Sequence, residues 1–128
     1  MRPPLLLLVD DEVGVRESLK MVFGKGYDLL EADSVDAALA QVDRARPDVV
    51  LLAVLMPRAD GLQALQRIKE IHPSCAVIML TGVNSQQLAT KAIDSGAFDF
   101  IGKPFDINDL RQKVARAVEA ATSTPPVQ

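Results

Sequence analysis

Four side chains in this 128-residue sequence have types suited to holding a phosphoryl group: Asp10, Asp11, Thr81 and Lys103. The adjacent carboxylates of Asp10 and Asp11 would repel each other in a cleft unless a cation lay nearby. Mg²⁺ suits such a pair, because it takes oxygen ligands and typically uses one or two carboxylates. Lys103 would add a positive charge and Thr81 a hydroxyl donor, which completes a cradle for a phosphoryl group. The residues themselves reveal no nucleophile for this cradle.

Each of these residues also has an ordinary structural interpretation. An Asp-Asp pair after a strand is often a polar turn and a helix N-cap. A single Thr or Lys at a strand end is usually solvated surface. His72 has no metal-ligand spacing and no evident catalytic partner, so we interpret it as an exposed residue in the turn before Pro73. The chemical interpretation therefore depends on whether the fold brings the four residues together.

Apolar runs alternate regularly with amphipathic stretches, which predicts five strand–helix units. The expected strands are 5–9, 27–32, 49–54, 76–80 and 98–101. Apolar residues at helical spacing predict helices within 13–23, 35–42, 62–71, 88–93 and 107–118. Glycine, serine and proline stand where these helices should begin or end, at Gly24, Ser34, Pro47, Pro73 and Gly96.

Strands joined by helical crossovers form a parallel sheet with helices on both faces, so the predicted fold class is α/β. Ligands of such sheets bind at the carboxyl ends of the strands. Asp10 and Asp11 follow the first strand, Thr81 follows the fourth and Lys103 follows the fifth. We therefore expect these four residues to converge on one small cleft.

Composition excludes several classes of protein. The length suits one domain, and 48% apolar residues can build its core. A net charge of −3 argues against direct nucleic-acid binding by this domain. Cys75 is the only cysteine, so no internal disulfide forms, and it should pack as a small hydrophobe. The apolar run 5–9 is too short for a membrane span or a signal-peptide core, so we expect a cytoplasmic protein.

As a set, five segments resemble the receiver domain of bacterial two-component response regulators. The segments are 9–12 (VDDE), 47–52 (PDVVLL), 56–61 (MPRADG), 80–82 (LTG) and 96–105 (GAFDFIGKPF). The resemblance implies a flavodoxin-like (βα)5 fold, a doubly wound parallel sheet with strand order 2-1-3-4-5. It implies a receiver domain over residues 1–121, followed by a tail of linker composition over 122–128.

The resemblance also implies a role for each residue of the cleft. Asp11 would bind Mg²⁺ directly and Asp10 would help through water, with the backbone carbonyl of Leu55 as a further ligand. Thr81 would donate a hydrogen bond to a phosphoryl oxygen, and Lys103 would pair with the phosphoryl charge.

Three further residues have implied roles in shape and switching. A cis bond is expected between Lys103 and Pro104, and Gly61 would allow the tight turn after the active-site loop. Phe100 would be the switch aromatic that turns inward when Thr81 moves toward the phosphate.

Ala53 is the departure from the family pattern, because the family places its phosphoacceptor Asp at this position, three residues before Met56. A methyl group can neither attack phosphorus nor carry an acyl phosphate. Asp10 and Asp11 are not expected to substitute, since their place is on the metal. We therefore expect a chain that cannot be phosphorylated and that binds Mg²⁺ weakly or not at all.

Two origins would explain an alanine at position 53. An engineered Asp-to-Ala replacement would trap the inactive state, and we favour it because the other pocket residues match the family. The alternative is a natural pseudo-receiver that acts as a phosphorylation-independent protein-interaction module.

The expected partners follow from the resemblance. With an acceptor at position 53, the domain would take a phosphoryl group from a sensor histidine kinase or a phosphotransfer protein. The signal would pass through the face of the fourth helix, fifth strand and fifth helix, to an output domain beyond Gln128 or to a separate target. Charges on these helices suit a homodimer, although solvated surface is the simpler interpretation. These charges are Lys91, Asp94, Arg111 and Lys113.

Enzyme classes are disfavoured. A phosphatase on such a sheet would need a paired-Asp nucleophile motif after the first strand, where Asp10 and Asp11 are instead adjacent. A nucleotide-binding domain would need a glycine-rich phosphate loop there. We therefore expect a signalling domain and not an enzyme.

Overall fold

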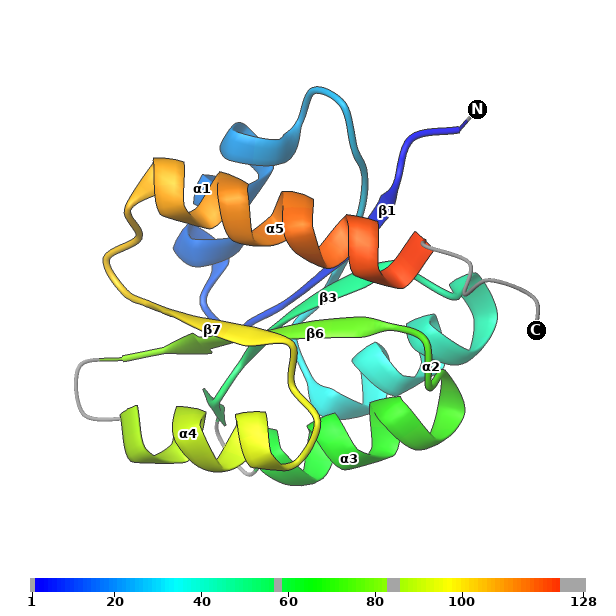
Figure 1. The fold of residues 1–128 in the computed structure, drawn as a ribbon, viewed down its shortest axis with the longest axis vertical. Coiled ribbons are helices and arrows are strands. Elements are labelled where there is room, and N and C mark those ends of the chain that lie inside the picture. The colour runs from blue at the N-terminus through cyan, green and yellow to red at the C-terminus, as the bar shows by residue number, and fades with distance from the viewer. Residues whose placement is uncertain (1, 57–58, 83–85, 123–128) are drawn as a thin grey trace.

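The computed structural model describes residues 2–56, 59–82 and 86–122 (Figure 1). The strands are β1 (Leu5–Val9), β2 (Asp28–Ala32), β3 (Val49–Ala53), β4 (Leu55–Met56), β5 (Ala59–Asp60), β6 (Ala76–Thr81) and β7 (Asp99–Gly102). The helices are α1 (Val13–Phe23), α2 (Val35–Ala45), α3 (Gly61–Ile71), α4 (Gln86–Asp94) and α5 (Ile107–Thr122). No helix within the described ranges has the length and apolar character needed to cross a membrane.

Five parallel strands form the central sheet in the order β2-β1-β3-β6-β7. Counted along the chain within this sheet, β6 and β7 are the fourth and fifth strands, so the predicted order 2-1-3-4-5 is confirmed. Helices α1 and α5 cover one face, and α2, α3 and α4 cover the other (Figure 1). The architecture is therefore a doubly wound α/β sandwich of three layers.

The continuous apolar runs of the central strands reflect burial on both faces of the sheet. Successive side chains of a strand point to opposite faces. In β1, Leu6 and Leu8 join the core under α1 and α5, whereas Leu7 and Val9 join the core under α2, α3 and α4. All four of these side chains are fully buried. A strand between two helical layers has no solvated side, so its sequence does not alternate.

The predicted helix signals agree with the structure at most ends. The Ser34 hydroxyl accepts a hydrogen bond from the Ala37 N–H and caps α2. Helix α1 ends before Gly24, and Gly96 has a left-handed backbone just after α4. Helix α5 runs through Thr122, one residue into the stretch expected to be a linker; residues 123–128 lie outside the described part of the chain.

Several sequence-based boundaries were wrong by one residue. Strand β2 begins at Asp28, β3 ends at Ala53, β6 includes Thr81 and β7 begins at Asp99. The segment after β3 was expected to be the active-site loop, and no strand was predicted in it. It instead contains a short antiparallel hairpin in which Leu55 pairs with Asp60. Pro57 and Arg58 of the matched motif lie outside the described residues.

His72 is not the exposed residue that the sequence suggested. Its Nε2 lies 3.0 Å from the carbonyl oxygen of Pro47, and the residue is only half-exposed. Its backbone N–H donates to Ile68 O and closes the last turn of α3. The ring therefore links the end of α3 to the segment just before β3, at the amino ends of the strands. Asp10, Thr81 and Lys103 lie at the carboxyl ends.

Candidate phosphoryl site

Strand register determines which residues meet at the carboxyl edge of the sheet. Val9 of β1 pairs with Leu52 of β3, so Asp10, the next residue, stands beside Ala53. On the other side of β3, Ala53 pairs with Leu80, the residue before Thr81. Strand β7 extends the same edge, since Thr81 pairs with Gly102 and Lys103 comes next. The ends of β1, β3, β6 and β7 therefore form one continuous rim.

Asp10 and Lys103 are in direct contact at this rim. The Lys103 Nζ lies 2.9 Å from Asp10 Oδ2, and Asp10 Oδ1 accepts the Glu12 N–H at 2.9 Å. Asp10 is 1% exposed, whereas the Lys103 side chain keeps 25% of its surface in water. A carboxylate buried this deeply requires a cation and hydrogen-bond donors. The fold supplies both, from β7 and from the loop after β1.

Thr81 is buried on the strand between β3 and β7. Its hydroxyl donates to the carbonyl oxygen of Ile101 at 3.3 Å, and its own carbonyl accepts the Lys103 N–H at 2.8 Å. A β-carbon added at Gly102 would lie 3.8 Å from the hydroxyl oxygen, so the hydroxyl is bordered by β7. In this state Thr81 is engaged with the backbone of β7.

Ala53 is 1% exposed and is the last residue of β3. It joins the core cluster on the α2, α3 and α4 side, together with Val54 and Met56. The sequence-based expectation placed its methyl among the four polar residues. The methyl contacts apolar side chains of this core and lies at the end of the strand next to that of Asp10. The side chain at position 53 therefore supplies no oxygen atom to the rim.

The loop after β3 returns so closely to the strand that it requires glycine at position 61. A β-carbon on Gly61 would collide with the Val54 carbonyl oxygen and would lie 2.9 Å from the Ala53 carbonyl oxygen. The Gly61 N–H donates to Val54 O at 2.9 Å. Leu55 is 62% exposed at the start of this loop, and Asp60 caps α3 through the Leu62 N–H.

The Lys103-Pro104 peptide bond is cis, as expected. Phe100 is half-buried and packs against the core on the α2, α3 and α4 side. The Nζ of Lys113 lies 5.6 Å from the centre of its ring and donates to its carbonyl oxygen at 2.7 Å.

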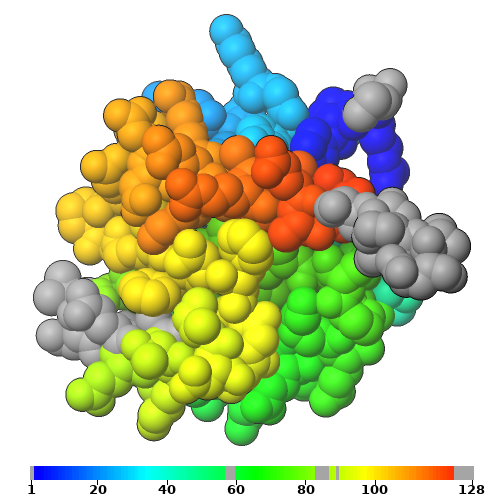
Figure 2. Space-filling model, in the orientation of Figure 1, coloured from blue at the N-terminus to red at the C-terminus, as the bar shows by residue number. Residues whose placement is uncertain are grey.

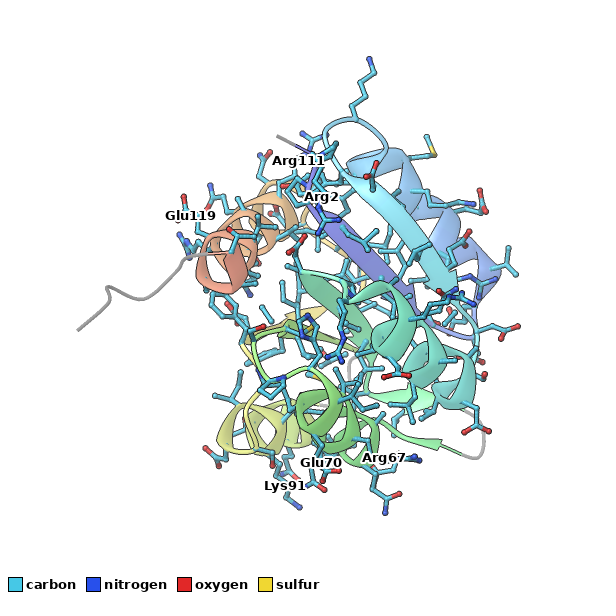
Figure 3. The ribbon with its side chains drawn as sticks, turned by 90° about the vertical axis from the view of Figure 1, so that its right-hand side faces the viewer. Arg2, Arg67, Glu70, Lys91, Arg111 and Glu119 are labelled. Carbon is cyan, nitrogen blue, oxygen red and sulfur yellow. The ribbon has the colours of Figure 1, made fainter. Side chains whose placement is uncertain are left out.

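Lys113 therefore differs from its sequence-based interpretation as a surface charge. Its ammonium also lies 3.3 Å from Asp109 and 3.8 Å from Asp99, and its side chain is 20% exposed. This cation is engaged within its own domain. Lys91 and Arg111 are exposed and lie at opposite ends of the molecule in Figure 3.

Sequence reasoning missed Arg16 entirely. Its Nη1 donates to the Asp10 carbonyl oxygen at 2.5 Å and its Nε donates to Glu31 at 3.0 Å. Lys20 also binds Glu31, at 3.1 Å, and together these cations hold the pKa of the Glu31 carboxyl below its ordinary value, Lys20 having the larger effect. The available signal was an arginine one turn into the helix that follows the acidic pair.

The rim offers few side-chain ligands for a metal ion. Within the described ranges, no group of three or more His, Cys, Asp or Glu side chains is arranged to hold a metal. Asp10 is occupied by Lys103, and Asp11 is exposed beside it. Mg²⁺ tolerates few protein ligands when water supplies the rest, so these residues fit it only as a water-rich site.

Comparison with known proteins agrees with this geometry. The family model of the response regulator receiver domain matches residues 6–115. Sporulation initiation phosphotransferase F of Bacillus subtilis is 37% identical over 112 residues, covering 87% of this chain and 90% of that protein. Chemotaxis protein CheY of Listeria monocytogenes is 35% identical over 116 residues, covering 89% and 98%. The crystal structure of the NtrX receiver domain from Brucella abortus superposes with a TM-score of 0.85 at 37% identity, covering 89% and 98%.

Other relatives are much longer than this chain. The match to regulatory protein AtoC of Escherichia coli is 36% identical and covers 89% of the chain but 25% of that protein. The chain thus spans nearly all of some relatives and about a quarter of others. On the family match over 6–115 and these relatives, the chain belongs to the response regulator receiver domain family of two-component signalling.

Proposed function

We propose that this chain is a two-component receiver domain held in its unphosphorylated state because position 53 lacks the acceptor carboxylate. The contact between Lys103 Nζ and Asp10 Oδ2, at 2.9 Å, carries this proposal. It sets a cation at the rim beside Asp10, whose strand neighbours that of Ala53, and pairs this cation within the domain. The polar groups of a phosphoryl site are thus present without the group that would receive the phosphate.

The chemistry becomes complete in the variant Ala53→Asp. A carboxylate oxygen there would attack the phosphorus of a phosphohistidine on a sensor kinase or phosphotransfer protein. The P–N bond would break, the imidazole would take up a proton and an acyl phosphate would form. Lys103 would then exchange Asp10 for the phosphoryl group, and the Thr81 hydroxyl would leave Ile101 O for a phosphoryl oxygen.

Asp11 and the Leu55 carbonyl would hold Mg²⁺, with Asp10 acting through water. The ion would neutralise charge on the phosphoryl oxygens. With Ala53 in place, one anionic ligand is missing and Asp10 is already paired. We therefore propose weak or absent Mg²⁺ binding for the chain itself.

The proposed output face consists of α4, β7 and α5, which adjoin one another on the surface in Figure 2. Phe100 lies on β7 within this face, so an inward turn of its ring would change the surface that a partner meets. That partner would be an output domain beyond Gln128, a separate target protein or a second copy of the chain. We expect the chain to act in the cytoplasm, where sensor kinases would transfer the phosphoryl group.

A natural pseudo-receiver is the second candidate function, and one observation favours it. Every buried side-chain nitrogen and oxygen in the described part of the chain has a hydrogen-bond partner. A domain whose site is satisfied without metal or phosphate can serve as a phosphorylation-independent interaction module. An engineered Asp-to-Ala form would not need a site that is fully hydrogen-bonded without metal or phosphate. The residue encoded at position 53 in the parent gene decides between the natural and the engineered origin.

Amide NMR spectra of this chain and of Ala53→Asp test the proposal. We expect acetyl phosphate with Mg²⁺ to shift the Thr81 and Phe100 resonances in Ala53→Asp and to leave them unchanged in the chain as given. Equal shifts in both proteins would refute an input blocked at position 53. Unchanged resonances in a folded Ala53→Asp would refute the assignment of the acceptor.

A further inference from the structure

Arg16 links three elements through polar contacts of one side chain. It lies on α1, its Nη1 donates to the Asp10 carbonyl oxygen after β1, and its Nε donates to Glu31 of β2. Its side chain is 14% exposed, so these bonds are largely shielded from water. Polar contacts with this degree of burial are worth more than the same contacts on an open surface.

Asp10 is held at several atoms as a result. Arg16 binds its carbonyl oxygen, the Glu12 N–H binds Oδ1 and Lys103 binds Oδ2. Its own N–H donates to Ala32 O at 3.2 Å. Arg16 is the side chain that fixes the backbone from which the other two bonds to the carboxylate extend.

The two bonds of Arg16 require a guanidinium group. The planar group directs Nε and Nη1 to two separate acceptors at once, in a fixed geometry. A lysine has one ammonium on a flexible stem and acts as a single point charge. Lys20 illustrates this difference one turn further along α1: it binds Glu31 and Glu17 and has no bond to Asp10.

We propose that Arg16 is a positioning residue of the phosphoryl site. By tying the Asp10 carbonyl to Glu31, it holds the loop after β1 so that the Asp10 carboxylate faces Lys103 and Asp11 stands ready for the metal. Groups that orient metal ligands from outside the coordination sphere typically change metal affinity by about 10- to 100-fold when removed. Because the metal part of this role rests on the proposed function, the test has one measurement that is independent of Mg²⁺.

Hydrogen exchange at the Glu12 amide is the independent measurement, because that amide donates to Asp10 Oδ1. We compare the chain with Arg16→Met, Arg16→Lys and Lys20→Met. The first two should exchange about tenfold faster at Glu12, as expected for loss of a hydrogen bond to a charged group. Lys20→Met is the matched control, since it also loses a bond to Glu31, and its Glu12 exchange should not change.

Mg²⁺ affinity is measured in the same variants on an Ala53→Asp background. Arg16→Met and Arg16→Lys should weaken it by about tenfold, and Lys20→Met should leave it unchanged. If Arg16→Met does not fold, Arg16→Lys decides, because it retains the charge and most of the stem. Glu12 exchange and Mg²⁺ affinity equal to those of Lys20→Met would overturn the role of Arg16. An Ala53→Asp protein that binds no Mg²⁺ with Arg16 intact would refute the proposed metal site, while Glu12 exchange still decides whether Arg16 positions Asp10.

Discussion

The ammonium of Lys103 lies 2.9 Å from the buried carboxylate of Asp10, although the two residues are 93 positions apart in the chain. The bond connects the loop after β1 to the end of β7, on opposite sides of β3. Since a buried carboxylate needs a counter-charge, the pair stabilises both strand ends in the absence of phosphate. In the proposed function, this lysine would pair with a phosphoryl group on residue 53.

Replacing Lys103 should show how much the buried carboxylate depends on it. Lys103→Met leaves the Asp10 carboxylate with the Glu12 N–H as its remaining partner, and we expect a loss of about 2 kcal/mol in the free energy of unfolding. Urea unfolding measures this loss. Lys113→Met is the matched control, because its carboxylate partners are partly exposed, and it should cost about 1 kcal/mol or less. Equal losses in the two variants would contradict a special dependence of Asp10 on its cation.

Gly61 and Gly14 should respond in opposite directions to the same added methyl group. Gly61→Ala drives a β-carbon against the backbone of Val54 and Ala53, so we expect a loss of about 2 to 3 kcal/mol. Gly14 lies within α1 with open space around its missing β-carbon, so Gly14→Ala should gain about 0.5 to 1 kcal/mol. Thermal unfolding of both variants checks the signs. A Gly61→Ala variant with unchanged thermal stability would mean that the loop after β3 does not need glycine.

Lowering the pH should weaken the stabilisation that the ion pairs of Glu31 give to the fold. Its pKa is lowered from the ordinary value of 4.5 by Lys20, and to a lesser extent by Arg16. A carboxyl with a lowered folded-state pKa stabilises the fold above its unfolded-state pKa and loses that effect as pH falls through the folded-state value. The stability gap between the chain and Glu31→Gln should therefore be largest above pH 4.5 and close below it.

Urea unfolding over a descending pH series measures this gap. Glu119→Gln, a charge change at an exposed position on α5, is the control for a general effect of net charge. If the gap between the chain and Glu31→Gln widens in acid, the ion pairs of Glu31 do not stabilise the fold.

Restoring the acceptor should make stability depend on Mg²⁺. In Ala53→Asp a third carboxylate joins Asp10 and Asp11, so repulsion should lower the melting temperature without metal. Mg²⁺ should raise it again, because a ligand that binds only the folded state stabilises that state. Melting curves with and without Mg²⁺ measure both effects. Equal Mg²⁺ stabilisation of Ala53→Asp and of the chain as given would show that position 53 adds nothing to the metal site.

Periodicity alone was enough to predict the order of the elements and the edge of the sheet where polar residues gather. Continuous apolar runs such as 5–9 and 76–80 mark strands buried on both faces, and these were placed to within a residue. Strand order came from the family resemblance, since nothing in a single run indicates its neighbours. The proximity of Asp10 and Lys103 was expected from the sheet, because the carboxyl ends of parallel strands meet. Their direct ion pair was not predicted.

Details that depend on side-chain direction could not be predicted. Arg16 reaches Asp10 because α1 turns its fourth residue toward the end of β1, and no spacing rule specifies that partner. Lys113 looked like a surface charge, yet it lies across the edge strand β7 and binds Phe100 O. The hairpin that pairs Leu55 with Asp60 is too short to leave a pattern of alternating hydrophobicity. In each case a tertiary contact decides the structure.

Intact-mass spectrometry after incubation with acetyl phosphate and Mg²⁺ is the most direct test of an input blocked at one methyl group. We predict one added phosphoryl group on a large fraction of Ala53→Asp and none on the chain as given. A stoichiometric phosphoryl adduct on the chain with Ala53 in place would contradict this, because another residue would then be the acceptor.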